Sequence, residues 1–370
     1  MTAPDLIVVK VGSSTLVDDG GKLDRGFIDA LCTQIAELRT RGKRVIVVSS
    51  GAAAAGREVL GFASPPADIP TLQACAATGQ AKLIESYEKA LASHDLSCGQ
   101  VLLTRRDVID RMGYLNARNT VERLLDLGVV PIVNENDTVS VAEFTFGDND
   151  MLGAIVSALV SADLYVILSD VAGLYTADPS LDDNARLISR VDHIDKELFR
   201  IAGSPFSSYG TGGMFSKVSA ARMMMAAGIP TFICHGRMPN CLIACVDETA
   251  RGTLFKQNGS IAHENPRKLW IGLAEVPQGT ITLDAGAMRA VLSQGASILP
   301  VGVTACEGSF KAGDVVDVNS FDGLLIGRGT IAYDLSDLER FKGLKLDVIA
   351  RFAGESGALP AIHRDDLFIF

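Results

Sequence analysis

Three polar side chains crowd the segment GDNDML, residues 147–152, directly before an apolar run that predicts a buried helix. They are Asp148, Asn149 and Asp150. Helix N-capping explains one such side chain, and three in succession are more than capping needs. Two carboxylates beside a carboxamide suit a site for a charged ligand, where Mg²⁺, a lysine or a substrate ammonium separates them from other anions. We therefore interpret this segment as part of a ligand site.

A second polar cluster, NEND, spans Asn134–Asp137 and directly follows an apolar run that predicts a strand. Taken alone, an Asx turn explains this cluster as well as a ligand site does. The two clusters, however, flank one short insert, TVSVAEFTF, residues 138–146. This arrangement favours a shared site over two unrelated turns.

Two lysines are candidates for binding phosphate. Lys10 lies inside the first apolar run and is followed by the turn GSS, and a lysine in a buried strand is costly unless its ammonium reaches water or an anion. The loop GTGGMFSK, residues 210–217, ends in Lys217 and leads into a helical pattern. Its glycines let backbone N–H groups converge on an oxyanion at a helix N-terminus. The loop matches neither the Walker A pattern nor GxGxxG, and by itself it is equally consistent with a surface turn.

The elements that must position these groups alternate along residues 1–255. Six apolar runs predict strands, with helical patterns between them: LIVVKV (6–11), RVIVVS (44–49), GQVLLT (99–104), VVPIVN (129–134), LYVILS (164–169) and PTFICH (230–235). Because the runs are apolar nearly throughout, the strands should be buried on both faces. This predicts an α/β fold, a mainly parallel open sheet sandwiched by helices, with ligands bound beyond the carboxyl ends of the strands.

The character of the sequence changes after a polar, Pro-terminated segment, residues 256–266, which we interpret as a linker. In residues 267–370, short alternating segments punctuated by Gly and Asp predict a small β-rich domain. Residues 267–343 hold seven Lys or Arg against nine Asp or Glu, a poor electrostatic footprint for RNA. We therefore expect a regulatory or assembly role for this domain.

The composition is that of a globular protein, with 48% hydrophobic and 21% charged residues. The formal charge of −10 disfavours a polyanionic partner. The N-terminal residues do not match an export signal and no apolar run reaches membrane-spanning length, so we expect a cytoplasmic protein with no membrane partner. The seven cysteines are typical of core residues in a reducing compartment. Cys234, His235, Cys241 and Cys245 lack a usual zinc spacing.

Motifs along residues 5–255 resemble the amino acid kinase family, and within it the branch that phosphorylates glutamate. The motifs are VVKVGSSTL, VVSSGAAAAGRE, LNARNT, PIVNENDTV, FGDNDMLGA, SDVAGLYTADP and GTGGMFSK, in the order of the family. Residues 267–343 are similar to a PUA domain, an RNA-binding-type module that many bacterial members of this branch carry. The order of the two domains supports the resemblance.

The resemblance implies phosphoryl transfer from ATP, with Mg²⁺, to the side-chain carboxylate of L-glutamate, the first step of proline biosynthesis. It implies that Lys10 and Lys217 neutralise the phosphoryl group in transit, with Asp150 holding both lysines. The implied glutamate site comprises Ser50, Gly51, Asn134, Asp137, Asp148 and Asn149. The implied nucleotide site comprises Lys10, Ser169, Asp170, Thr211, Gly212, Gly213, Met214, Phe215, Ser216 and Lys217. Ser169 and Ser216 stand where the family often has threonine, and both keep a hydroxyl.

The resemblance also implies a homodimer or homotetramer and inhibition by proline, with residues 138–146 as the sensor. Contact with the reductase that uses glutamyl phosphate is a further hypothesis. The metal ligands, if any, are not identified by the sequence.

Two alternatives stay open. Another kinase of the same fold, acting on acetylglutamate, carbamate or uridylate, would differ in the residues of NEND and GDND. An RNA-binding or RNA-modifying protein would depend on the second domain, whose net negative charge argues against it.

Overall fold

The computed structural model describes residues 4–18, 20–139, 149–203, 213–257, 268, 271–272, 277–353 and 358–370. The chain divides into two compact units, residues 1–263 and 264–370. The boundary between the units falls inside the segment 256–266 interpreted as a linker, most of which lies outside the described residues.

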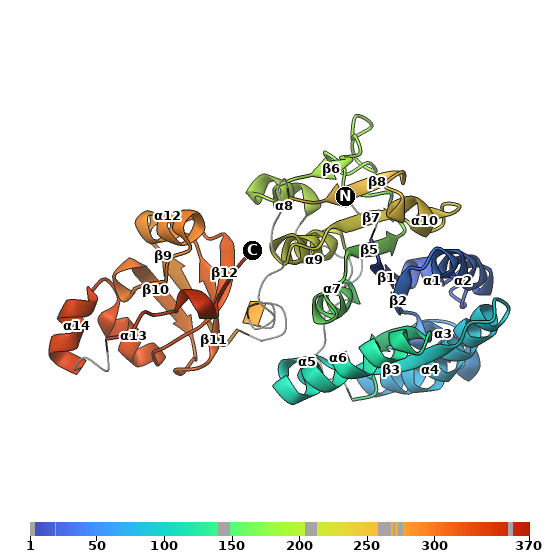
Figure 1. Cartoon of the computed structure of the whole chain (residues 1–370), viewed down its shortest axis with the longest axis horizontal. Helices are drawn as coiled ribbons and strands as arrows, with labels where there is room; N and C mark the ends of the chain where they lie inside the picture. The colour runs from blue at the N-terminus through green and yellow to red at the C-terminus, as the bar shows by residue number, and fades with distance from the viewer. Residues whose placement is uncertain are drawn as a thin grey trace. The chain divides into compact units, whose positions relative to one another are not determined.

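The first unit is built on an eight-stranded sheet with the order β3-β4-β2-β1-β5-β7-β8-β6 (Figure 1). Its strands are β1 (Leu6–Val11), β2 (Arg44–Val48), β3 (Cys98–Leu103), β4 (Val130–Glu135), β5 (Leu164–Ser169), β6 (Arg190–Val191), β7 (Thr231–His235) and β8 (Gly252–Phe255). Neighbouring strands are parallel except β7 with β8. The six predicted runs form strands within one residue of the expected bounds, and the mainly parallel sheet is confirmed. The short strands β6 and β8 lie outside the predicted runs.

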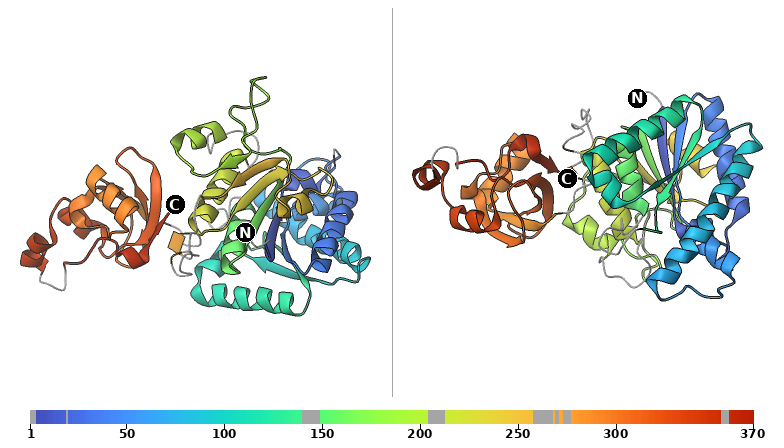
Figure 2. Two further views of the ribbon diagram at one scale, coloured as in Figure 1. Left: turned by 45° about the horizontal axis from the view of Figure 1, so that its top comes forward. Right: turned by 90° about the horizontal axis from the view of Figure 1, so that it is seen from below.

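Helices cover both faces of this sheet (Figure 2). They are α1 (Ser13–Leu16), α2 (Arg25–Thr40), α3 (Ala52–Leu60), α4 (Ile69–Ala92), α5 (Arg105–Ile109), α6 (Arg111–Asp126), α7 (Asn149–Leu159), α8 (Lys196–Ala202), α9 (Met214–Ala226) and α10 (Cys241–Val246). Apolar side chains of α2, α4 and α10 share one core with alternate residues of the central strands. Helix α7 packs against β1 and β5 and also contacts α9.

Strand alternation decides which helices each side chain of β1 meets. Val9 and Val11 belong to the core that includes α2 and α4, so Lys10 projects from the opposite face of the sheet. Lys10 is level with Val48 of β2 and with Ile167 of β5. The chain crosses from one side of β1 to the other between β4 and β5. The carboxyl ends of β1 and β5 therefore form the topological switch point where open α/β sheets bind ligands.

The second unit contains a five-stranded sheet with the order β10-β9-β11-β12-β13. Its strands are β9 (Gly279–Leu283), β10 (Val303–Gly308), β11 (Val315–Asn319), β12 (Leu325–Thr330) and β13 (Leu367–Ile369). Its helices are α12 (Ala285–Gln294), α13 (Leu335–Phe341) and α14 (Leu346–Ala353), with short 3-10 turns at Pro300–Gly302 and Arg364–Asp366. The strands are antiparallel except β9 with β11. The β-rich character is confirmed, whereas these helices were not expected.

Within the part of the chain that the structure describes, no helix combines the length and the apolar character needed to cross a membrane.

Candidate active site

Three ionisable side chains meet beyond the switch point and form what we name the charged cluster: Lys10, Asp150 and Lys217. The Lys10 Nζ lies 2.5 Å from Asp150 Oδ1, and the Lys217 Nζ lies 3.1 Å from Asp150 Oδ2. Their exposed fractions are 3%, 0% and 5%. Two ammonium groups thus share one buried carboxylate in a region of low dielectric. Such a cluster is suited to stabilising an anion that develops during a reaction.

The position of Asp150 is fixed by how α7 meets β5. The hydroxyl of Tyr165, a fully buried residue of β5, donates a hydrogen bond of 2.8 Å to the carbonyl oxygen of Asp150. A Cβ at Gly153 would lie 2.3 Å from that hydroxyl. A residue other than glycine at 153 would therefore displace either the tyrosine or the first turn of α7.

The turn after β1 is held against β5 next to the Lys10 side chain. The backbone N–H of Gly12 donates to the carbonyl oxygen of Leu168 at 3.1 Å, which fixes the turn against β5. A Cβ at Gly12 would lie 3.7 Å from the Lys10 Nζ. This turn therefore passes directly beside the Lys10 ammonium.

A second group of polar side chains, which we name the amide cluster, consists of buried Ser50, Gln80 and Asn134 and half-buried Asn149. The Nδ2 of Asn149 donates to the carbonyl oxygen of Ser49 at 2.7 Å, to the Oγ of Ser50 at 2.8 Å and to the Oδ1 of Asn134 at 3.1 Å. The Nδ2 of Asn134 donates to the Oε1 of Gln80 at 2.9 Å. The structure thus brings together three residues of the implied glutamate site and one residue that the sequence analysis missed.

The sequence does carry a weak signal for Gln80. The buried face of α4 includes Cys75, Ala76, Gly79, Leu83 and Tyr87, with Gln80 among them. A glutamine within an otherwise apolar helical stripe needs a hydrogen-bond partner. No property of α4 alone, however, shows that the partner is Asn134 of β4.

Gly51 connects β2 to α3 in a backbone conformation that favours glycine. Its φ is 88°, in the left-handed region, and it is the N-cap residue of α3. The neighbouring Ser50 is 6% exposed. This turn therefore places the Ser50 hydroxyl in the amide cluster and starts α3 directly after it.

Asp137 is half-buried, and no other described residue forms an ion pair or a hydrogen bond with its side chain. Burial, together with the nearby Glu135 carboxylate, raises the pKa of Asp137 to about 6. A carboxylate in this situation gains from a cationic ligand, because a nearby positive charge favours its ionised form.

The residues implied for the nucleotide are only partly described. The Oγ of buried Ser169 donates to the Oδ1 of exposed Asp170 at 2.9 Å, at the end of β5. Gly213 precedes α9, whose first residues Met214, Phe215 and Ser216 are half-buried and lead to Lys217. Thr211 and Gly212 lie outside the described residues, as does Asp148 of the implied glutamate site.

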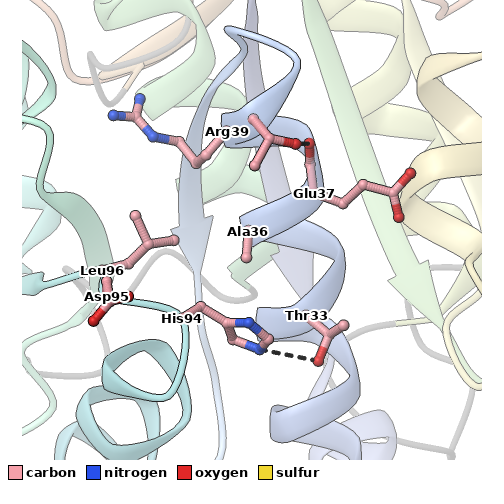
Figure 3. Close-up of a pocket in the computed structure, with 8 residues that line it drawn as sticks. Thr33, Ala36, Glu37, Arg39, His94, Asp95 and Leu96 are labelled. Atoms are coloured by element: carbon pink, nitrogen blue, oxygen red, sulfur yellow. Dashed lines mark hydrogen bonds between the residues drawn. The ribbon is translucent and has the colours of Figure 1, made fainter.

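Two other features stand apart from these clusters. A surface hollow between α2 and the end of α4 (Figure 3) is lined by Thr33, Ala36, Glu37, Arg39, Thr40, His94, Asp95 and Leu96. It contains no residue implied for the site and its charges are mixed.

The Sγ atoms of buried Cys234 and Cys245 lie 3.4 Å apart. Among the described residues, no group of three or more His, Cys, Asp or Glu side chains is placed to hold a metal ion.

Comparison with known proteins places the chain in a family. The model of the amino acid kinase family matches residues 5–235, and that of the PUA domain matches residues 279–352. The chain belongs to the amino acid kinase family, as its motifs predict.

Full-length relatives narrow this class to the glutamate 5-kinases. The glutamate 5-kinase of Paramagnetospirillum magneticum is 46% identical over 99% of this chain and 98% of its own length. That of Geobacter sp. is 43% identical over 98% of this chain and 97% of its own length. Among solved structures, UMP kinase from Ureaplasma parvum covers 68% of this chain and 98% of its own, with a TM-score of 0.48 and 14% identity. That last likeness is too remote to bear on function.

Proposed function

We propose that this protein transfers the γ-phosphoryl group of ATP to the side-chain carboxylate of L-glutamate, giving glutamyl 5-phosphate, the first step of proline biosynthesis. The observation that carries the proposal is the charged cluster of Lys10, Asp150 and Lys217, buried at the switch point of a kinase fold. The likeness to glutamate 5-kinases along the whole chain supports glutamate over other acceptors.

The reaction needs no general base. An oxygen of the substrate carboxylate, already ionised at neutral pH, attacks the γ-phosphorus, the bond from that phosphorus to the bridging oxygen breaks, and ADP leaves. Negative charge moves onto the phosphoryl oxygens and the bridging oxygen during this step. The ammonium groups of Lys10 and Lys217 stabilise that charge, and Asp150 holds both in place before the substrates arrive. Burial of the cluster also protects the acyl phosphate from water.

Recognition of glutamate falls to the neighbouring groups. Asp137 receives the α-ammonium of the substrate, because its carboxylate has no cationic partner among the described residues. The N-terminus of α3, which begins after Gly51, favours the α-carboxylate through the helix dipole. Ser50, Asn134 and Asn149 complete the site, and Asp148 is proposed for it on the resemblance alone.

Mg²⁺ would be bound chiefly by the phosphates of ATP. The carboxylate of Asp150 is already shared by two lysines, and the described residues offer no group of three metal-binding side chains. Magnesium in kinases is often held by substrate phosphates with one or two carboxylates, and exposed Asp170 is the one carboxylate among the residues implied for the nucleotide. When bound, the ion neutralises charge on the phosphates.

Trapping the product with hydroxylamine tests the proposal. Purified protein is incubated with ATP, Mg²⁺, hydroxylamine and one acid at a time: L-glutamate, acetylglutamate, aspartate or bicarbonate. We expect hydroxamate and ADP in equal amounts with glutamate and background signal with the other acids. A stronger signal with another acid would overturn the choice of substrate, and an absence of ADP formation with every acid would overturn the activity.

Regulation and assembly extend this proposal on the resemblance alone. We propose a cytoplasmic homodimer or homotetramer that is inhibited by proline at or near the glutamate site. Residues 138–146 are the proposed sensor, and residues 140–146 lie outside the described residues. Replacing this insert should abolish inhibition by proline while phosphorylation of glutamate continues. Unchanged sensitivity to proline would exclude the insert as the sensor.

A further inference from the structure

Gln80 joins the amide cluster from a helix that carries none of the residues implied for the site. It lies on α4, is 9% exposed and accepts a hydrogen bond from Asn134 through its Oε1. Its helix is pressed closely against α3, because a Cβ at Gly79 would lie 1.9 Å from the carbonyl oxygen of Ala52. Gln80 therefore has little freedom to move away from Asn134.

Backbone groups at both ends of the cluster restrict how the two asparagine amides can be oriented. The backbone N–H of Glu135 can only donate, and it donates to the Oδ1 of Asn134 at 2.9 Å. The carbonyl oxygen of Ser49 can only accept, and it accepts from the Nδ2 of Asn149 at 2.7 Å. Asn134 must therefore turn its Nδ2 toward α4, where a hydrogen-bond acceptor is required.

Gln80 supplies that acceptor. The orientation of the Asn134 amide in turn restricts the orientation of the Asn149 amide. Because the Oδ1 of Asn134 already faces the Glu135 N–H and the Nδ2 of Asn149, rotation of the Asn134 amide would place two donors against each other. In the observed arrangement, the Nδ2 of Asn149 donates to oxygen atoms of Ser49, Ser50 and Asn134. Asn149 then has only its Oδ1 left for a ligand, and that oxygen can accept but not donate.

We infer that Gln80 is a positioning residue for the glutamate site: its Oε1 fixes the Asn134 amide, and through it the amide of Asn149, so that Asn149 presents an acceptor to the substrate ammonium. This inference rests on the function proposed above. The arrangement leaves the Nε2 of Gln80 buried with no hydrogen-bond partner among the described residues. A buried donor without a partner is unfavourable. Glutamine at this position therefore lowers the stability of the fold slightly, while its Oε1 orients the amides of the site.

The test replaces each of two buried glutamines by methionine, which has a similar length and no strong acceptor. Gln80→Met removes the acceptor for Asn134. Gln34→Met is the matched control, because Gln34 is 8% exposed and, among the described residues, its side chain bonds only to the backbone of Leu242 and Ala30. We measure kcat, the KM for glutamate, the KM for ATP and the midpoint of thermal unfolding of the full chain.

We expect Gln80→Met to raise the KM for glutamate about tenfold, the equivalent of one hydrogen bond, with the KM for ATP within about twofold. Gln34→Met should lower the unfolding midpoint and leave both KM values unchanged. In Asn134→Ala, adding Gln80→Met should raise the KM for glutamate no further, because the residue that Gln80 orients is gone. An unchanged KM for glutamate in Gln80→Met, or full additivity in the double variant, would overturn the inference.

The two proposals fail in different ways. If the unaltered protein phosphorylates a different acid, the proposed function fails, and the comparison of Gln80→Met with Gln34→Met is repeated with that acid. If the unaltered protein phosphorylates glutamate and Gln80→Met behaves like Gln34→Met, only the role of Gln80 fails.

Discussion

The charged cluster and the amide cluster lie in the same unit and share the first turn of α7. The first consists of ionisable side chains, whereas the second consists of neutral amides and a hydroxyl. Asp150 belongs to the charged cluster and Asn149, its neighbour in the chain, belongs to the amide cluster. Successive residues of a helix point about 100° apart, so one turn can supply two adjacent sites. The two described polar residues of GDNDML, Asn149 and Asp150, thus belong to different clusters.

The difference between the clusters indicates a division of labour. Charged groups in a low-dielectric site act strongly on charge that develops in the transition state, and their loss should lower kcat. Neutral amides hold fixed orientations and interact similarly with bound substrate and transition state, so their loss should raise the KM for glutamate. Each prediction below tests this division.

Lys217→Met should have the largest effect. Removing one of the two ammonium groups that face the transferred phosphoryl group should lower kcat about a thousandfold, with the KM for glutamate changed by less than about threefold. Steady-state kinetics on the purified chain measures both quantities. Lys89→Met, which changes a lysine of α4 that is 74% exposed, should leave kcat unaltered. A rise in the KM for glutamate with an unaltered kcat would place Lys217 in recognition instead.

Asp150→Asn should lower both activity and stability. Two buried ammonium groups lose their shared carboxylate, so kcat should fall about a hundredfold and the free energy of unfolding by roughly 3 kcal/mol. Urea unfolding measures the latter. The double variant Asp150→Asn with Lys217→Met should be more stable than Asp150→Asn alone, because it removes one of the two buried ammonium groups that have lost this carboxylate. Equal stability of the two variants would show that the lysines are not destabilised by losing Asp150.

The KM for glutamate should depend on pH through Asp137. Its pKa is about 6, so lowering the pH from 7.5 to 5.5 protonates the carboxyl and removes the partner of the substrate ammonium. We expect the KM for glutamate to rise toward tenfold per pH unit below that pKa, while the KM for ATP changes less. Asp137→Asn should have a high KM for glutamate that is nearly constant over this range. A variant that kept the pH dependence would assign it to another group.

Gly51→Ala should have the smallest effect. An alanine at a φ of 88° costs about 1 kcal/mol of stability, while its Cβ would meet only ordinary contacts, such as the Cβ of Leu16 at 3.6 Å. The shift of the Ser50 turn should raise the KM for glutamate a few-fold. Gly42→Ala is the matched control, because Gly42 has a φ of 76° and open space around it. Thermal unfolding should show a similar loss of stability in Gly42→Ala, whereas its KM for glutamate should not change. If the KM for glutamate rose equally in both variants, the loss of stability alone would explain the effect of Gly51→Ala.

The strands of the main sheet were predictable because short runs of neighbouring apolar residues indicate them. The six apolar runs form six strands of the main sheet, and polar residues such as Asn134 and Ser169 lie at the carboxyl ends of these strands. The strand β8 was missed because its four residues, Gly252–Phe255, are too few to show a pattern of their own. It pairs antiparallel with β7 only after the chain has returned through α10. The helices of the second unit were missed because their short amphipathic patterns lie among turn residues.

By itself, the sequence determined the class of fold, the two-part organisation and the types of chemical groups at the strand ends, because periodicity and turn residues act over a few neighbouring positions. Only the tertiary structure decided which of these groups touch. The contact of Lys10 with Asp150 depends on the face of β1 that α7 covers, and that of Gln80 with Asn134 depends on the close approach of α3 and α4 at Gly79. Contacts between distant segments follow from how whole elements pack, and local sequence does not encode them.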